Sequence, residues 1–177
     1  LKKHNIPINF ECAATEEMLE IACDICPESC CIVPEKREEL TTEGGLNLLT
    51  NNNYLKSFIK KLKSKNIAVS LFIDADKKCF LEAISLGANC VELHTGQYAL
   101  AKNQETELSK IKEIATLSKK YNISIHAGHG LNFKNVGKII NIDEIKEVNI
   151  GHSIIADALF NGLETSIKNM KKKLRRN

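Results

Sequence analysis

The sequence has no long apolar run and no strong excess of charge of one sign. No stretch approaches the roughly 20 apolar residues of a membrane-spanning helix, and the first residues, LKKHNIPINF, lack the apolar core of a signal peptide. The formal net charge is only +3, and the basic residues gather near the end, at Lys168 and in residues 171–176. We therefore expect a cytoplasmic protein with neither a membrane nor a nucleic acid as its partner.

The sequence also lacks the even cysteine count of a disulfide framework. Its seven cysteines suit a reducing compartment. Four of them lie in CDICPESCC, a spacing that is also compatible with a zinc or redox cluster. Cys30 and Cys31 begin an apolar strand, however, and neighbouring side chains of a strand point to opposite faces. We expect no metal, and a metal site at residues 23–31 stays the alternative that elemental analysis would test.

Short apolar segments alternate with amphipathic helices six times along the chain. With 43% hydrophobic and 27% charged residues, the composition is that of one globular domain, which we expect to include residues 1–177. Alternation at this spacing predicts a parallel sheet and an α/β fold. The expected strands are residues 8–12, 30–33, 67–73, 90–93, 123–126 and 148–150. Thr15 is expected to cap the first helix. Apolar stripes are expected on the helix after the second strand, at Leu55, Phe58, Ile59 and Leu62, and on one final helix after the last strand, at Leu159, Leu163, Ile167, Met170 and Leu174.

Nearly every expected strand runs out into a polar tail. In βα barrels the active site is built at the carboxyl ends of the strands, so these tails predict a catalytic face. A closed barrel of this type has eight βα units, whereas six are found in the sequence. We therefore predict a TIM (β/α)8 barrel of which the third to the eighth unit are present.

Two glycine-histidine motifs follow the last two expected strands. They are Gly128-His129-Gly130 and Gly151-His152. Glycine lets the backbone approach an oxyanion closely, and barrels of this type bind phosphate at these loops. Each motif alone is weak, because either histidine could be structural, but the pair favours a phosphate site.

Carboxylates end two other strands. Glu11 follows an apolar strand, where partial desolvation would suit proton transfer near neutral pH, although a structural ion pair explains it equally well. Glu92 and His94 alternate along one strand and so point the same way, either as a catalytic pair or as a supporting hydrogen bond.

A long polar segment, VPEKREELTTEGG, joins the second strand to its helix. Its hydroxyls, its alternating charges and a Gly44-Gly45 hinge are typical of a mobile lid over a site. The alternative is a surface excursion with a solvated run of charges.

Together these residues resemble the pyridoxine 5'-phosphate synthase family of deoxyxylulose-phosphate-dependent vitamin B6 biosynthesis. The matching stretches span nearly the whole chain in the expected order: NFECAATEEML, CCIVPEKREELTTEGGLNL, VSLFIDAD, VELHTGQYA, HAGHGLNFKNV and VNIGHSIIADALFNGL.

The resemblance implies a transferase that condenses 1-deoxy-D-xylulose 5-phosphate with 3-amino-2-oxopropyl phosphate, closes a pyridine ring and releases phosphate and water. It implies no metal or organic cofactor, and it implies a homo-oligomer. The positions that match catalytic residues are Glu11 as general acid/base, His129 as proton donor and Glu92 as a stabiliser of a transition state. Those that match substrate ligands are Thr41 for the deoxyxylulose phosphate and Gly130, Gly151 and His152 for the aminoketone phosphate.

The sequence departs from the family at its start, where two βα units of the barrel are absent. At about 30 residues per unit, roughly 60 residues are missing. They would carry a further catalytic histidine and phosphate-binding arginines. We therefore expect the sequence to be a fragment of a longer gene product, with a true start further upstream or a decayed or truncated form as the alternatives. We expect the isolated chain to be inactive. The alternative function is that of a non-catalytic module, derived from this barrel, that binds phosphate esters or serves assembly.

Overall fold

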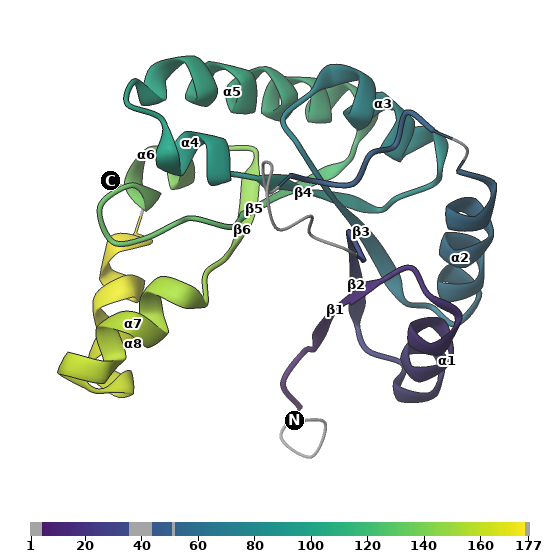
Figure 1. Ribbon diagram of the computed structural model, residues 1–177, viewed down its shortest axis with the longest axis horizontal. Helices are drawn as coiled ribbons and strands as arrows, with labels where there is room; N and C mark the ends of the chain where they lie inside the picture. Colours follow the sequence, from purple (N-terminus) through teal and green to yellow (C-terminus); the bar gives the residue numbers. More distant parts are fainter. Residues whose placement is uncertain (1–4, 36–43, 51, 176–177) are drawn as a thin grey trace. The chain divides into compact units, whose positions relative to one another are not determined.

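A computed structural model describes residues 5–35, 44–50 and 52–175 of the chain. Thr41 and most of the predicted lid lie outside these residues. The chain groups into two compact units, Leu1–Glu92 and Leu93–Asn177, which are described in turn. Each strand is followed by one or two helices, so the class is α/β as predicted, and the six strands follow one another in chain order in the sheet (Figure 1).

The first unit consists of parallel strands, each followed by a helix. Its elements are β1 (Asn9–Ala13), α1 (Glu16–Ile25), β2 (Ser29–Val33), α2 (Asn53–Ser64), β3 (Ala68–Ile73), α3 (Lys77–Ser85) and the first part of β4 (Cys90–His94). β2 pairs in parallel with both β1 and β3. The predicted cap of α1 is confirmed, because the Thr15 hydroxyl accepts a hydrogen bond from the Met18 amide at 3.3 Å.

The core of the first unit lies between α2 and the strands. The predicted apolar stripe of α2 is buried throughout, at Leu55, Phe58, Ile59 and Leu62. β3 is buried over five of its six residues, which explains its nearly continuous apolar sequence.

The described end of the predicted lid is docked against β3. The Gly45 amide donates to Asp74 Oδ1 at 3.1 Å, and the next amide, that of Leu46, donates to the Phe72 carbonyl at 2.7 Å. A Cβ at Gly45 would overlap the Cα of Ile73. Glycine is therefore needed at position 45 for close approach to the β3 backbone, and the predicted hinge motion stays a prediction.

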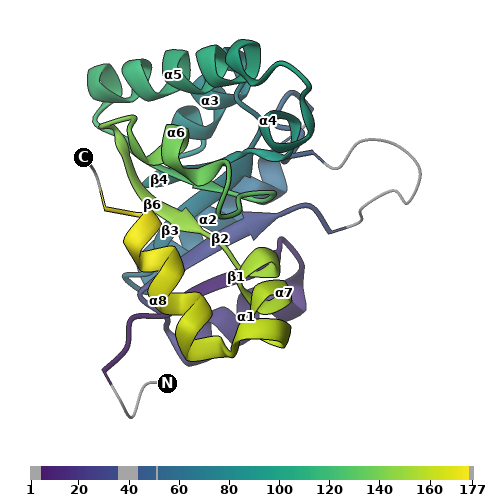
Figure 2. The same cartoon turned by 90° about the vertical axis from the view of Figure 1, so that its left-hand side faces the viewer.

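The second unit begins with the end of β4. It continues with α4 (Gly96–Leu100), α5 (Gln104–Tyr121), β5 (Ser124–Gly128), α6 (Val136–Ile140), β6 (Ile145–Asn149), α7 (His152–Asn161) and α8 (Leu163–Lys173). β5 and β6 pair in parallel, with an irregularity in register at Ile125/His126. The short helix α4 was not predicted. In Figure 2 the long helix α5 and the pair α7 and α8 are both in view.

The prediction of one final helix is wrong. Gly162 adopts a φ of +80°, ends α7 and precedes α8, so the chain turns there. The Ser166 hydroxyl of α8 donates to the Ile154 carbonyl of α7 at 3.0 Å and joins the two helices. Of the predicted stripe, Met170 is buried, whereas Leu159 is 80% exposed. Among all the described helices, none has the length and apolar character needed to cross a membrane.

Candidate active site

A row of polar side chains crosses the strands of the first unit. In the parallel register Glu11 of β1 stands opposite Cys31 of β2, and Cys31 stands opposite Ser70 of β3. The Cys31 thiol donates to Oε2 of Glu92 on β4 at 3.5 Å. Two carboxylates that were predicted from separate motifs therefore flank one thiol.

Cys31 and Glu92 are shielded from solvent, with exposed fractions of 0% and 3%. Burial, and after it the negative charge of Glu92, raise the pKa of the Cys31 thiol well above its ordinary value, while the Ser70 hydroxyl lowers it to a smaller extent. The thiol therefore stays protonated and acts as a hydrogen-bond donor rather than as a nucleophile.

Glu11 differs from Glu92 in its surroundings. Its side chain is exposed, so the partial desolvation predicted for it is wrong in this chain. The prediction placed Glu11 at the end of a buried strand, whereas in the described residues β1 pairs with β2 alone. Glu11 keeps its place opposite Cys31, which sets it in line with the buried carboxylate.

The turn after β5 holds His129 and Gly130 in left-handed backbone conformations, with φ of +69° and +77°. Such a φ is uncommon for a residue with a side chain. The Thr95 hydroxyl lies within hydrogen-bond distance of two carbonyls of this turn, 2.9 Å from that of Gly128 and 2.6 Å from that of His129. The Asn135 side-chain amide donates to the Gly130 carbonyl at 3.1 Å.

The His129 ring packs on the ring of His94, with 4.9 Å between the centroids. Gly96 lies beside both rings. A Cβ at Gly96 would stand 2.7 Å from His94 Nε2 and 3.1 Å from His129 Cδ2. The absence of a side chain at Gly96 therefore makes room for the pair of histidines.

The second glycine-histidine motif forms the start of α7. Gly151 is its N-cap, His152 is its first residue, and both are exposed. The Ser153 hydroxyl donates to the Leu131 carbonyl at 2.9 Å, which ties this first turn to the loop that follows Gly130. The two motifs that were predicted to bind phosphate are therefore connected, and amide groups at a helix start suit an anion.

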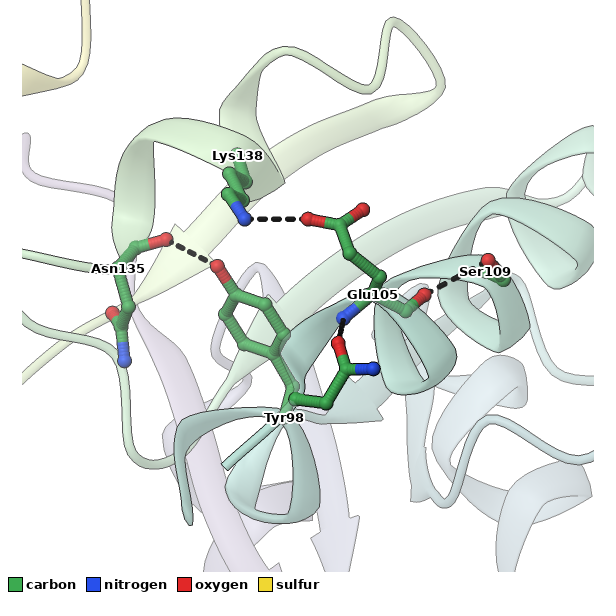
Figure 3. A network of polar contacts seen from close by, with 6 residues as sticks. Tyr98, Glu105, Ser109, Asn135 and Lys138 are labelled. Carbon is green, nitrogen blue, oxygen red and sulfur yellow. Dashed lines mark hydrogen bonds and ion pairs between the residues drawn. The ribbon is translucent and has the colours of Figure 1, made fainter. Parts of the chain in front are cut away.

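Further polar contacts join α4, α5 and α6 to one another and to Asn135 (Figure 3). The buried Tyr98 hydroxyl of α4 donates to the Asn135 carbonyl at 2.8 Å. Lys138 of α6 forms an ion pair with Glu105 of α5 at 2.6 Å. Sequence reasoning missed Thr95, Tyr98 and Asn135, because their partners lie far away in the chain and leave no periodic signal.

No three histidine, cysteine or acidic side chains are grouped to hold a metal ion within the described part of the chain. Cys30 and Cys31 point to opposite faces, as predicted: Cys30 contacts the Cys12 sulfur at 3.5 Å, whereas Cys31 contacts Glu92.

The alternating fold and the titratable residues at its strand ends are those of an α/β enzyme. The chain matches the family described as Pyridoxal phosphate biosynthesis protein PdxJ over residues 1–176. It belongs to this family.

Named relatives agree with the family assignment. The chain is 50% identical over 173 residues to the pyridoxine 5'-phosphate synthase of a Sulfurihydrogenibium species, covering 97% of this chain and 71% of that protein. It is 51% identical over 168 residues to the pyridoxine 5'-phosphate synthase of Zymomonas mobilis, covering 94% of this chain and 66% of that protein. The chain thus spans about two thirds to three quarters of the length of such relatives.

Solved structures of distant sequence share the fold. The citrate synthase SbnG superposes with a TM-score of 0.62 at 13% identity, over 94% of this chain and 71% of that one. The native KDPGal structure gives a TM-score of 0.64 at 9% identity, over 97% of this chain and 72% of that one. At these identities the likeness shows the fold alone.

Proposed function

We propose that this chain serves the pyridoxine 5'-phosphate synthase reaction. In that reaction 1-deoxy-D-xylulose 5-phosphate and 3-amino-2-oxopropyl phosphate condense to pyridoxine 5'-phosphate, phosphate and water. The observation that carries the proposal is the family match over residues 1–176, together with relatives about half identical that are named for this activity.

The chemistry requires repeated proton transfer. Imine formation, loss of water and ring closure each move protons between carbon, nitrogen and oxygen, and a positioned carboxylate or imidazole speeds such steps by roughly 10²–10⁴. Glu11 acts as general acid/base, and Glu92 stabilises positive charge that develops in a transition state. The buried position of Glu92, with the Cys31 thiol as donor, supports a role in which its charge is little screened by water.

His129 acts as a proton donor, and the loops around it bind phosphate. Gly130, Gly151 and His152 take the aminoketone phosphate, and Thr41, which lies outside the described residues, takes the deoxyxylulose phosphate. The Ser153 contact with Leu131 supports this division, because it links the turn at Gly130 to the exposed first turn of α7.

The six βα pairs correspond in this proposal to the third to eighth units of a (β/α)8 barrel in one domain. The greater length of the relatives supports it, since two further units at about 30 residues each account for a difference of that size. The proposal includes a cytoplasmic homo-oligomer that works without metal or organic cofactor.

The test is the formation of pyridoxine 5'-phosphate, measured by chromatography with the two phosphorylated substrates. The purified chain is assayed beside a version that carries two upstream βα units of the family. We expect product from the extended protein and little or none from the chain alone. Product from neither, with phosphate esters still bound, would favour a non-catalytic binding module instead.

Matched variants of the active form test the residue roles. Glu11→Gln removes the carboxylate and should lower kcat by about 10²-fold or more. Glu20→Gln makes the same exchange on the exposed face of α1 and should leave kcat unchanged. Equal kcat values for both variants would remove Glu11 from the mechanism.

A further inference from the structure

We propose that Thr95 is a positioning residue for this reaction, whose buried hydroxyl fixes the backbone of His129 and Gly130 and thereby aims the imidazole. The inference rests on the proposed function only for the role of His129. The geometry itself lies wholly within the second unit.

Thr95 connects the end of β4 to the turn after β5 by three donor-acceptor contacts. Its backbone amide donates to the Gly128 carbonyl at 2.8 Å. Its hydroxyl lies 2.9 Å from the same carbonyl and 2.6 Å from the carbonyl of His129. A hydroxyl carries one proton, so the two carbonyls share it in a three-centre arrangement. Thr95 has an exposed fraction of 0%, and water does not compete for these contacts.

The turn needs such support because of its conformation. His129 has a φ of +69°, in the left-handed backbone region, where residues with a Cβ are disfavoured. Gly130 continues in the same region with a φ of +77°. Strained residues of this kind persist where the surrounding structure over-determines them, and they cluster at functional sites.

The first turn of α4 closes on the same residues. The Thr95 carbonyl accepts from the Ala99 amide at 2.9 Å, which anchors Thr95 to that helix. A Cβ at Gly130 would stand 2.7 Å from the Ala99 Cβ and 3.4 Å from the Gly96 Cα. The helix start and the turn are thus in direct contact, and a shift of Thr95 would move both.

The contacts of Thr95 with this turn set the direction of the His129 imidazole. The His129 ring contacts the His94 ring on one side, and both rings pass close to Gly96, the residue after Thr95. If the His129 backbone relaxed out of the left-handed region, its Cβ would point elsewhere and the ring contact would be lost. A displacement of about 1 Å in a catalytic group can cost a hundredfold in rate. Thr95 itself presents no group to a substrate, because its hydroxyl is engaged with the two carbonyls.

The test compares Thr95→Val with Thr95→Ser. Valine keeps the branched shape of threonine but has no hydroxyl, whereas serine keeps the hydroxyl and loses one methyl group. The first readout needs no turnover: NMR on the purified chain measures the coupling between the amide and α protons of His129, which reports φ, and the amide shift of Gly130. We expect both signals to change in Thr95→Val and to be retained in Thr95→Ser.

The second readout uses whichever form of the protein makes product. Thr95→Val should lower kcat at least about tenfold, since loss of an aligned proton donor removes part of a 10²–10⁴-fold effect, and Thr95→Ser should restore most of it. A role confined to fold stability predicts that folded Thr95→Val retains both kcat and the His129 coupling. If Thr95→Val does not fold, Thr95→Ala removes the hydroxyl while leaving room for water.

The outcomes separate the two proposals. Unchanged His129 and Gly130 signals in a folded variant without the hydroxyl would overturn the positioning role, whatever the activity. Signals that change in Thr95→Val and are retained in Thr95→Ser would support the positioning role of the Thr95 hydroxyl. This holds even if no form of the protein makes product, and in that case only the proposed function fails.

Discussion

The thiol of Cys31 donates a hydrogen bond to the Glu92 carboxylate at 3.5 Å, and both side chains are almost fully buried. The donor lies on β2 and the acceptor on β4 of the same unit. A carboxylate in such a place needs donors to offset the loss of water. Cys31 supplies one without adding charge, because burial and Glu92 raise the pKa of its thiol. The thiol thus supplies a hydrogen bond to the buried side chain of Glu92, which the proposed mechanism uses.

The raised pKa predicts that Cys31 resists thiol reagents in the folded chain. At about pH 8 it stays protonated, whereas reagents such as iodoacetamide attack the thiolate. Cys26 is exposed at the end of α1 and should react first. We expect modification of Cys31 to be at least about a hundredfold slower than that of Cys26, because burial and protonation act together. Peptide mass spectrometry after timed labelling measures both rates. Comparable rates would contradict the buried contact with Glu92.

Gly96→Ala should destabilise the second unit. The added Cβ would approach His94 Nε2 to 2.7 Å and His129 Cδ2 to 3.1 Å, so the two rings must shift. Such overpacking costs about 1–3 kcal/mol. Gly137→Ala is the matched control, because a Cβ there meets nothing within 4 Å inside helix α6. That variant should gain about 0.4–1 kcal/mol from a less flexible unfolded state. Urea unfolding compares the two, and equal free energies of unfolding would refute the close packing at Gly96.

Tyr98→Phe isolates one bond of the network in Figure 3. Tyr98 is 1% exposed, and its hydroxyl donates to the Asn135 carbonyl at 2.8 Å. Without it a shielded carbonyl loses a donor, and we expect a loss of roughly 1–2 kcal/mol in the free energy of unfolding. Tyr54→Phe, at a side chain 51% exposed, should stay within about 0.5 kcal/mol of the parent. If the two variants lose the same amount, the Tyr98 bond contributes nothing measurable.

The sequence predicted best what depends on periodicity. The apolar stripe of α2 and the continuous burial of β3 follow from repeats of 3.6 and from apolar runs that single segments contain. Glu11 and Glu92 were selected because they end or occupy such strands, and the register does set both beside Cys31. Local caps such as Thr15 were equally visible, since a cap and its helix are adjacent in the chain.

What the sequence could not show depends on contacts between distant residues. Thr95 contacts the turn at Gly128, 33 positions further along the chain, and neither segment carries a local sequence pattern that predicts this contact. Gly45 was predicted as part of a hinge, and its close approach to the Ile73 backbone could not be predicted because flexibility and close approach both select glycine. Gly162 interrupts a helical apolar pattern, which a single glycine usually leaves intact, yet its positive φ turns the chain there.

His126 should make stability depend on pH. It stands opposite Glu147 in the β5–β6 register, with 3.7 Å between Nδ1 and Oε1. Burial lowers the pKa of His126, and the Glu147 carboxylate raises it by a smaller amount. The folded state therefore binds the proton less readily than the unfolded state, whose histidine titrates near 6.5. The contribution of neutral His126 to the free energy of unfolding is fully present above about pH 6.5. It is lost as the pH falls toward the lowered pKa of His126 in the folded state.

Two variants test the direction of this pH dependence, and they should change it in opposite ways. His126→Asn cannot titrate, so its free energy of unfolding should change less than that of the parent between about pH 7.5 and pH 5. Glu147→Gln removes the group that raises the pKa of His126, so the loss of stability should extend further into acid. Urea unfolding at a series of pH values, taken as differences from the parent, removes the contribution of the other carboxylates. A His126→Asn curve parallel to that of the parent would show that folding does not lower the pKa of His126. If acid sensitivity decreases in the order Glu147→Gln, parent, His126→Asn, burial outweighs the ion pair.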